Sequence, residues 1–460
     1  MPIELTNRRA LVLGLGASGF SMVRWLAARG ASVRVADSRN APPFAQRLHD
    51  DLPAVELHTG GFRAESISGI DLIAISPGVS RAELLVRTAV DQGIEVVGDI
   101  ELFARIREEF PGNRVIAITG SNGKSTVTEM VGAMVRAAKT RTLVAGNIGL
   151  PILEALSEIE GGQRRRPDVF VLELSSFQLE STCSLNPDAA AVLNVSEDHL
   201  DRYSSMREYA DAKARIFFGD GIQVVNREDG RVRGMIGPGR RILTFGLDEP
   251  WDEGNWGLRE TAGELWIAEG RANLMKASEL KVAGLHNVAN ALAALALCRA
   301  IRLPYEPLLE ALVEFQGLPH RVQKIAEIKG VAFYDDSKGT NVGATVAALM
   351  GMSSRIALIA GGDGKGQDFS PLREAVAKKT TGVVLIGRDS DKIASALAGS
   401  GVAILRAVTM REAVRAALSL AQPGEAVMLS PACASFDMFR NYEHRAEVFI
   451  EEVRALEADQ

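Results

Sequence analysis

This sequence has few cysteines and no excess of positive charge. Its three cysteines, Cys183, Cys298 and Cys433, are an odd number without close spacing among 460 residues. They argue against a disulfide framework or a zinc site and favour a reducing compartment. The formal net charge of −6 argues against a general affinity for nucleic acid or an anionic membrane. An anionic substrate would therefore have to meet local groups of basic residues.

Long apolar runs are missing as well. The longest mainly apolar stretch, residues 288–298, is too short to span a bilayer and predicts a buried helix. The first residues, Met1–Glu4, lack the basic and apolar regions of a signal peptide. With 47% hydrophobic and 24% charged residues, the composition is typical of a soluble protein. We expect a cytoplasmic monomer with no nucleic-acid or membrane partner.

What the sequence does contain is α/β patterning in three segments. Residues 1–97 alternate short apolar strands with amphipathic helices, which predicts a Rossmann-like domain. Residues 98–316 hold a phosphate-loop pattern and a glycine-rich part, 227–281, expected to form an antiparallel subsheet. Residues 317–460 return to α/β alternation, with strands predicted at 355–360, 383–386, 403–405 and 426–429. The predicted fold class is α/β, with Rossmann-like N-terminal and C-terminal domains around a central P-loop ATPase-type domain.

The phosphate-loop pattern lies between a predicted strand, 115–118, and a predicted helix, 127–138. A strand, a glycine-rich turn and a helix N-terminus together direct backbone N–H groups at an anion. Ile118 stands where the usual pattern has its first glycine, so this is a variant loop, and a chance Gly-Lys-Ser is the alternative. Lys124 would reach the β/γ-phosphates and the Ser125 hydroxyl would bind Mg²⁺. The residues predicted to bind ATP here are Gly120, Ser121, Asn122, Gly123, Lys124, Ser125 and Thr126.

A second glycine motif, G-x-G-x-x-G at residues 14–19, follows the first predicted strand. Asp37 stands at the end of the second strand, where an acid can contact a ribose hydroxyl. Alone, this pattern predicts a nicotinamide-dependent dehydrogenase, or it reflects only tight strand–helix packing. A dehydrogenase has no need of a second, triphosphate site, so we predict that this segment holds a nucleotide handle on a substrate.

Several longer motifs together resemble one family, the Mur ligases of bacterial cell-wall synthesis. They are TGSNGKST (119–126), GNIG (146–149), LELSSFQL (172–179), NVSEDHLDRY (194–203), GLHNVAN (284–290), GLPHR (317–321), DDSKGTN (335–341) and LSPACAS (429–435). The resemblance covers essentially the whole chain. It implies an amide ligase in which ATP phosphorylates the carboxylate of UDP-N-acetylmuramoyl-L-alanine and the amine of D-glutamate attacks the acyl phosphate.

The resemblance also implies roles at the ATP site. A strand-end carboxylate, Glu173, suits Mg²⁺ beside the triphosphate, with a surface acid as the alternative. By resemblance, His199 binds a second Mg²⁺ and Lys213 is carbamylated to serve as a further ligand. The implied metal ligands are thus Ser125, Glu173, His199 and Lys213, and the implied catalytic residues are Lys124, His199 and Lys213. Asn287 and Asn290 would face adenine, unless they only cap a helix, while Arg321 and Asp336 would contact the nucleotide from the third segment.

Substrate-binding residues are implied in the same way. The uridine diphosphate would contact Gly16, Ala17, Ser18, Asp37, Ser38, Arg39 and Gly78, and Asn147 would bind the end of the muramoyl substrate that is phosphorylated. D-Glutamate, with two carboxylates, would be bound by Lys338, Thr340, Lys365, Ser435 and the backbone N–H of Phe436. For Lys365, a solvated loop lysine is the alternative.

The added amino acid is indicated by a missing motif. The absence of Asp-Asn-Pro-Arg from the third segment favours D-glutamate over diaminopimelate or lysine.

Two other functions stay open at this point. One is a folylpolyglutamate synthase, although that enzyme lacks a UDP-binding domain. The other is a non-catalytic nucleotide sensor, and the presence of Lys124, Glu173, His199 and Lys213 argues against it.

Overall fold

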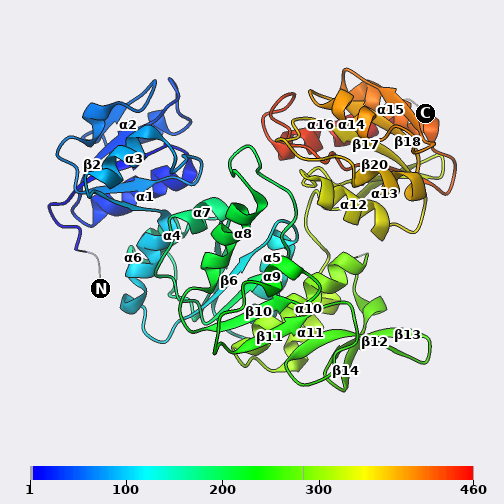
Figure 1. Cartoon of the computed structure of the whole chain (residues 1–460), viewed down its shortest axis with the longest axis horizontal. Coiled ribbons are helices and arrows are strands. Elements are labelled where there is room, and N and C mark those ends of the chain that lie inside the picture. The colour runs from blue at the N-terminus through cyan, green and yellow to red at the C-terminus, as the bar shows by residue number, and fades with distance from the viewer. Residues whose placement is uncertain (1–3, 283, 459–460) are drawn as a thin grey trace.

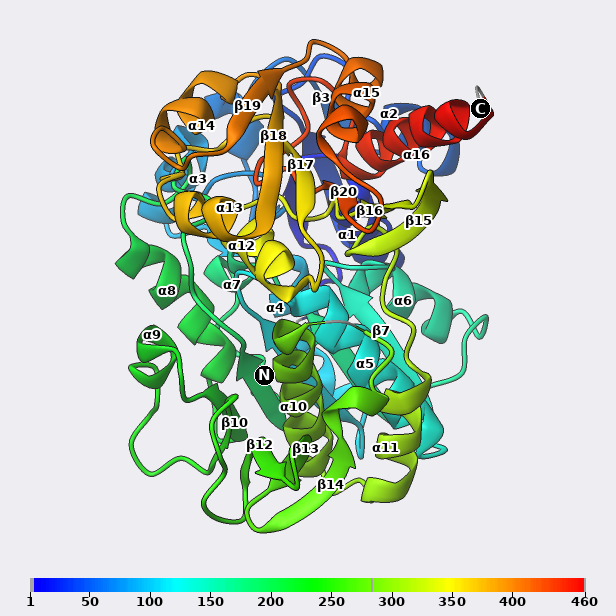
Figure 2. The ribbon, with the colours of Figure 1, turned by 90° about the vertical axis from the view of Figure 1, so that its right-hand side faces the viewer.

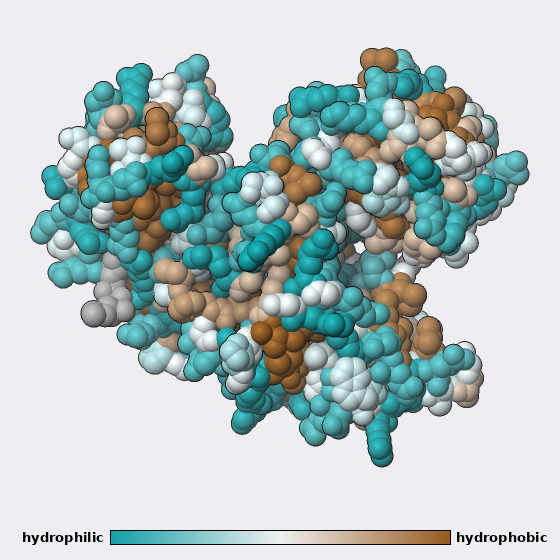
Figure 3. All heavy atoms as spheres, viewed as in Figure 1, coloured by the Kyte–Doolittle hydropathy of each residue, from teal (hydrophilic) through white to brown (hydrophobic). Residues whose placement is uncertain are grey.

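The computed structural model describes residues 4–282 and 284–458 and contains three α/β units, each built on its own sheet (Figure 1). The N-terminal and C-terminal units both lie on the same side of the central unit. A hollow separates them on the face drawn in Figure 3. None of the sheets crosses residues 97/98 or 316/317 in the described chain, and the domain boundaries at these positions stay a prediction.

The N-terminal unit has a parallel five-stranded sheet in the order β3-β2-β1-β4-β5. The elements are β1 (Arg9–Leu13), α1 (Ala17–Ala28), β2 (Ser32–Ala36), α2 (Ala45–Asp51), β3 (Glu56–His58), η1 (Ala64–Ile67), β4 (Leu72–Ile75), α3 (Leu84–Asp91) and β5 (Glu95–Val97). The connections reverse direction between β1 and β4, and a crevice opens at such a point beyond the carboxyl ends of the strands. The loops after β1 and β4 border this crevice.

The central unit has a nine-stranded sheet in the order β14-β13-β12-β11-β10-β9-β6-β8-β7. Its strands are β6 (Arg114–Thr119), β7 (Thr142–Gly146), β8 (Val169–Glu173), β9 (Ala189–Val192), β10 (Ile222–Asn226), β11 (Ile242–Phe245), β12 (Asn255–Thr261), β13 (Glu264–Glu269) and β14 (Ala272–Lys276). Its helices are α4 (Asp99–Arg105), η2 (Arg107–Glu109), α5 (Lys124–Ala137), α6 (Ile152–Glu160), α7 (Ser176–Glu180), α8 (Met206–Ala214), η3 (Arg215–Phe217), α9 (Gly230–Arg233), η4 (Ala277–Glu279), α10 (Leu285–Ala300) and α11 (Tyr305–Glu314).

The prediction of an antiparallel subsheet in residues 227–281 is partly wrong. Strands β12, β13 and β14 are antiparallel as expected, but β12 pairs in parallel with β11 and so continues the main sheet. Pairing Thr244 with Asn255 and Phe245 with Trp256 removes the free edge that a separate subsheet would leave. The buried helix expected over 288–298 is confirmed, because the side chains from Ala291 to Cys298 in α10 have no exposed surface.

The C-terminal unit has a six-stranded sheet in the order β15-β16-β20-β17-β18-β19. Its elements are β15 (Gln323–Ile328), β16 (Val331–Asp335), α12 (Val342–Gly351), β17 (Ile356–Gly361), α13 (Leu372–Lys379), β18 (Thr380–Ile386), α14 (Ser390–Ala396), β19 (Ala403–Arg406), α15 (Met410–Leu420), β20 (Ala426–Leu429) and α16 (Tyr442–Ala458). The four predicted strands are confirmed with shifts of up to three residues. The hairpin β15–β16 was not predicted; Lys329 and Gly330 at its turn both have positive φ (51° and 75°), as type I′ turns require.

Contacts between units bring the C-terminal unit over the phosphate loop. Figure 2 shows α12 above α10, and a Cβ on Gly284 at the start of α10 would lie 3.3 Å from the Cα of Gly351 at the end of α12. No helix in the described residues has both the length and the apolar character that crossing a membrane needs.

Candidate active site

The phosphate loop joins the buried strand β6 to α5. Gly123 precedes α5 with φ of +84°, in the left-handed region that favours glycine. A Cβ at this position would lie 2.5 Å from Oδ1 of Asn290. Glycine is therefore required here both by the backbone and by the close approach of α10.

Two lysines converge on the loop. The Lys124 Nζ donates hydrogen bonds to the carbonyls of Gly120 (2.8 Å) and Ser121 (3.0 Å), and the Lys213 Nζ donates to Gly120 (2.9 Å). Burial, reinforced by the neighbouring Lys124, lowers the pKa of Lys213 well below its usual range. Burial also lowers the pKa of Lys124. Two buried ammonium groups on one carbonyl oxygen repel each other. The arrangement therefore favours either a bound anion or loss of a proton from one of the two lysines.

Glu173 ends β8 and is 1% exposed. Its Oε1 accepts a hydrogen bond from Nδ2 of Asn147 (2.7 Å), whereas its Oε2 is buried without a partner among the described residues. A buried, unpartnered carboxylate oxygen is costly unless a cation binds it. This carboxylate is within electrostatic reach of Lys124 and Lys213, so the surface-acid alternative is wrong.

His199 lies in the loop after β9, with φ of +56°. Its ring packs edge-on against Phe177, with 4.7 Å between centroids. Burial lowers the pKa of His199 to about 4, so the imidazole is neutral at physiological pH, the form that binds metals. No group of three or more His, Cys, Asp or Glu side chains in the described chain is arranged to hold a metal; the predicted ligand set includes Ser125 and Lys213 instead.

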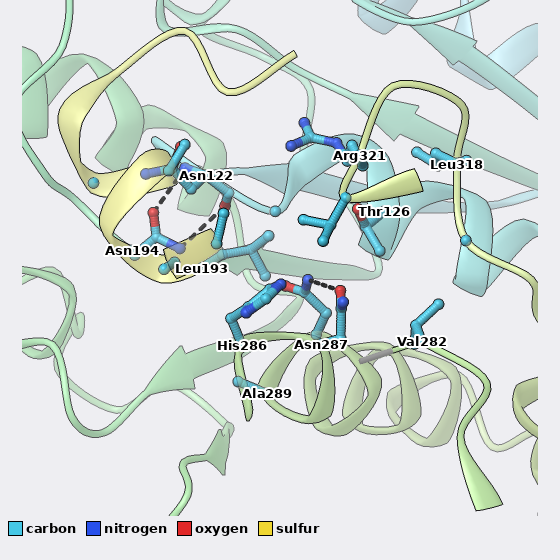
Figure 4. A pocket seen from close by; sticks show the side chains of 18 of the residues that line it. Asn122, Thr126, Leu193, Asn194, Val282, His286, Asn287, Ala289, Leu318 and Arg321 are labelled. Carbon is cyan, nitrogen blue, oxygen red and sulfur yellow. Dashed lines mark hydrogen bonds between the residues drawn. The ribbon is translucent and has the colours of Figure 1, made fainter. Parts of the chain in front are cut away.

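A cavity of about 340 Å³ lies beside the phosphate loop, between the central and C-terminal units (Figure 4). We call it the P-loop cavity. Seven of the residues predicted to bind ATP line it: Asn122, Gly123, Thr126, Asn287, Asn290, Arg321 and Asp336. Gly120, Ser121, Lys124 and Ser125 belong to the same loop but do not line the cavity. The Nε of Arg321 is buried without a partner among the described residues, as expected of a cation that awaits an anionic ligand.

The asparagine pair on α10 faces the P-loop cavity. The Asn290 Nδ2 donates to Oδ1 of Asn287 (3.3 Å). Gly284, not an asparagine, is the N-cap residue of α10, and the assignment of the pair to adenine stays a prediction. The cavity is also lined by His286, for which the sequence predicted no individual role.

A second pocket, which we call the N-terminal cleft, opens between the N-terminal and central units. All eight residues predicted to contact the uridine nucleotide or the muramoyl end line it: Gly16, Ala17, Ser18, Asp37, Ser38, Arg39, Gly78 and Asn147. The Asp37 carboxylate, only 1% exposed, accepts hydrogen bonds from the Leu15 N–H (2.7 Å) and from Nη2 of Arg39 (2.6 Å). Asp37 therefore orients Arg39, whose side chain is 51% exposed.

None of the five residues predicted to bind D-glutamate lines the P-loop cavity or the N-terminal cleft. The Nζ of Lys365 forms an ion pair with Asp198 of the central unit, so the solvated-lysine alternative is wrong. The Nζ of Lys338 lies 5.3 Å from the centre of the Tyr442 ring, and burial lowers its pKa. The side chain of Phe436 is 76% exposed. Thr340 and Ser435 line neither pocket.

Asp198 and Asn341 form a junction that the sequence analysis missed. The Asn341 Nδ2 donates to Oδ1 of Asn122 in the phosphate loop (2.9 Å) and to Oδ2 of Asp198 (3.2 Å). Since Lys365 also contacts Asp198, two groups of the C-terminal unit dock on one carboxylate. Both residues lie within the quoted motifs, which was the only signal available.

Comparisons with known proteins match each of the three units. Profiles of three family domains match the chain: the MurD-like N-terminal domain of Mur ligases over residues 8–98, the Mur ligase middle domain over 118–298 and the Mur ligase glutamate ligase domain over 320–433. A UDP-N-acetylmuramoylalanine--D-glutamate ligase of Thiobacillus denitrificans is 59% identical over 469 residues, covering 99% of this chain and 98% of that protein. The chain belongs to the Mur ligase family. A ligase with the same name from Nitrosomonas eutropha is 56% identical and covers the same shares.

Solved structures of peptide and amino-acid ligases share the fold. The UDP-N-acetylmuramate-alanine ligase of Thermotoga maritima superposes with a TM-score of 0.61 at 19% identity, covering 97% of this chain and 99% of that one. A pseudomurein peptide ligase of Methanothermus fervidus gives a TM-score of 0.58 at 19% identity, covering 98% and 100%. The predicted three-domain α/β fold is confirmed.

Proposed function

We propose that this protein is an ATP-dependent ligase that adds D-glutamate to UDP-N-acetylmuramoyl-L-alanine in peptidoglycan precursor synthesis. The observation that carries the proposal is that Glu173 interacts with residues of both the N-terminal cleft and the phosphate loop. Asn147 lines the N-terminal cleft and donates to Glu173, and Lys124 of the phosphate loop acts electrostatically on the same carboxylate. A substrate carboxylate entering from the cleft would meet a triphosphate there. The names of the relatives at 56–59% identity support these substrates.

The reaction proceeds in two steps, the first at the γ-phosphorus of ATP and the second at the carboxyl carbon of the alanyl group. A carboxylate oxygen of the alanyl group attacks the γ-phosphorus of ATP, ADP leaves, and an acyl phosphate forms. The neutral amine of D-glutamate then attacks the carbonyl carbon, phosphate leaves with its electron pair, and the nitrogen releases one proton to solvent. Negative charge builds up in both transition states, so fixed cations lower both barriers. Lys124 and Arg321 would move onto the phosphates from the positions they hold here.

The donor set fits two Mg²⁺ ions. Ser125 and Glu173 would hold one, and His199 and a carbamylated Lys213 the other; the unpartnered Glu173 Oε2 and the neutral His199 ring support this assignment. Bound Mg²⁺ would neutralise phosphate charge and orient the reacting oxygens.

Carbamylation of Lys213 is supported by the same burial that lowers its pKa. A neutral amine can attack CO₂; an N–C bond forms, one amine proton is released, and the carbamate carries a negative charge. The side chain is 1% exposed and lies over the ring of Tyr209, with 4.5 Å from Nζ to the centroid. Water is thereby excluded from the product, and the neighbouring Lys124 would stabilise its charge.

For D-glutamate we propose the predicted set of Lys338, Thr340, Lys365, Ser435 and Phe436. Lys365 already binds a carboxylate, that of Asp198. The Phe436 N–H has no acceptor among the described residues. A cation and a free N–H suit a substrate with two carboxylates. Closure of the C-terminal unit would complete this site and exclude water from the acyl phosphate.

Phosphate release from Mg-ATP tests the proposal directly. The purified protein should release phosphate with UDP-N-acetylmuramoyl-L-alanine and D-glutamate, and not with L-glutamate or meso-diaminopimelate. A Lys124→Ala variant is the control for contaminating ATPase. Activity with meso-diaminopimelate alone, or ATP hydrolysis that ignores the uridine substrate, would contradict it.

We further propose that the protein acts as a monomer, since each pocket is lined by residues of one chain, and that it is cytoplasmic, in keeping with its three free cysteines. Light scattering after size-exclusion chromatography should give the mass of one chain. A dimer mass at assay concentrations would refute the monomer.

A further inference from the structure

Arg202 is a mostly buried cation at the junction between the N-terminal and central units. Its Nη1 donates to the carbonyl of Pro77 and its Nη2 to the carbonyl of Val79, each at 3.2 Å. These carbonyls flank Gly78, which lines the N-terminal cleft. The guanidinium therefore holds the turn after β4, and Arg202 is not itself among the residues that line the cleft.

The same guanidinium is fixed within the central unit. Its Nη2 donates to Oε2 of Glu180 at the end of α7 (3.0 Å), and the two side chains are 13% and 16% exposed. The guanidinium carbon lies 4.3 Å from the centre of the Phe177 ring, a cation–π distance. A second donor, the Tyr203 hydroxyl, binds the other oxygen of Glu180 (2.5 Å). The charge of Arg202 is thus neutralised and its direction set.

Arg202 also belongs to the turn that carries His199. The backbone N–H groups of Arg202 and Tyr203 both donate to the carbonyl of His199 (3.0 and 3.1 Å). Phe177, under the guanidinium, packs against the His199 ring. One side chain therefore connects the wall of the N-terminal cleft with the imidazole beside the phosphate loop.

We propose that Arg202 is a positioning residue that couples binding of the uridine nucleotide to the placement of His199. A ligand that contacts Gly78 fixes the turn whose carbonyls accept hydrogen bonds from Arg202. The position of Arg202 in turn restrains the His199 loop, through the packing of Phe177 and through the backbone hydrogen bond from Arg202 to His199. The inference rests on the proposed function, because it takes the ligand of the N-terminal cleft to be a uridine nucleotide. Arg202 itself touches no reacting atom.

A second ion pair joins the same two units and provides a matched control. Arg24 of α1 donates to Oε1 of Glu154 in α6 (2.6 Å), and neither residue lines the N-terminal cleft. Figure 1 shows α6 beneath the N-terminal unit. Arg24→Met removes an ion pair between the units without touching the turn around Gly78.

The test compares Arg202→Met, Arg202→Lys and Arg24→Met with the unchanged protein. Binding of uridine diphosphate is measured by calorimetry without ATP, followed by KM for each substrate, kcat and thermal unfolding. Two lost carbonyl contacts should weaken uridine diphosphate binding about tenfold or more in Arg202→Met. KM for ATP should stay within about twofold, because the P-loop cavity is not involved, while kcat falls as His199 is released. Arg202→Lys, which can reach one carbonyl, should have an affinity for uridine diphosphate and a kcat between those of Arg202→Met and the unchanged protein.

Two results would overturn the inference. Unchanged uridine diphosphate binding in a folded Arg202→Met protein would mean that the turn needs no support. Equal losses in Arg24→Met would mean that general contact between the units, not Arg202, sets the affinity. If the unchanged protein itself fails to bind uridine diphosphate, the proposed function fails instead.

Discussion

Replacing Gly123 with alanine tests whether the conformation of the phosphate loop creates the nucleotide site. At φ of +84° the left-handed backbone costs an alanine about 1–2 kcal/mol. Its Cβ would lie 2.5 Å from Oδ1 of Asn290, and moving that side chain breaks a hydrogen bond to Asn287 worth about 1 kcal/mol. The sum of about 2–3 kcal/mol is relieved if the loop leaves its binding conformation. We therefore expect roughly 30- to 150-fold weaker ATP binding.

Gly112 offers a matched control for this substitution. It has the same φ of +84°, but a Cβ there would meet nothing within 4 Å, and it does not line the P-loop cavity. Gly112→Ala should lose stability through the backbone alone and keep its ATP affinity, measured by calorimetry with Mg-ATP. If Gly123→Ala binds ATP as tightly as Gly112→Ala does, a left-handed loop packed against α10 is not what binds the nucleotide.

Three further predictions follow from single side chains. Lys365→Met should raise KM for D-glutamate about tenfold or more without changing KM for ATP, whereas the exposed Lys378→Met should change neither; equal effects in steady-state assays would remove Lys365 from the amino-acid site. Burial raises the pKa of Asp99 from 3.8 to about 6, so the folded protein binds more protons than the unfolded chain between these values and loses stability as pH rises through them. Asp99→Asn should therefore gain about 3 kcal/mol relative to the unchanged protein between pH 3.5 and 7 in urea unfolding, and a pH-independent difference would contradict this. Lys213→Arg introduces a permanent cation that cannot form a carbamate, so kcat should fall roughly 100-fold and not respond to bicarbonate. Activity of the unchanged protein that survives CO₂ depletion would refute carbamylation.

Local signals were sufficient for much of the fold. The strand before the phosphate loop, its glycines and the start of α5 are neighbours in sequence, so their pattern predicts strand, turn and helix together. The hairpin β15–β16 escaped because its turn, Lys329-Gly330, lacks the Asn or Asp that marks most turns of this kind. The join of β11 to β12 escaped for a different reason: a strand pattern does not specify which partner the strand takes.

The sites divide in a similar way. Every residue predicted at the N-terminal cleft lines it. Seven of the eight follow strands of the parallel N-terminal sheet, whose carboxyl ends meet at one edge, and the eighth, Asn147, follows β7 of the central unit. Local sequence carries no information on what lies across the interface between units. The ion pair of Lys365 with Asp198, and the support of the Gly78 turn by Arg202, join residues 167 and more than 120 positions apart.

The sequence by itself determined the family, the strand–loop–helix units and the chemical types at each site, because these depend on short-range patterns and recurring motifs. Only the tertiary structure decided that the Asp37 carboxylate binds Arg39, that one Glu173 oxygen is buried without a partner among the described residues, and that Lys213 loses its proton easily. Each of these properties depends on burial and on partners brought from distant segments. Solvent exclusion and electrostatic neighbourhood exist only once the chain has folded.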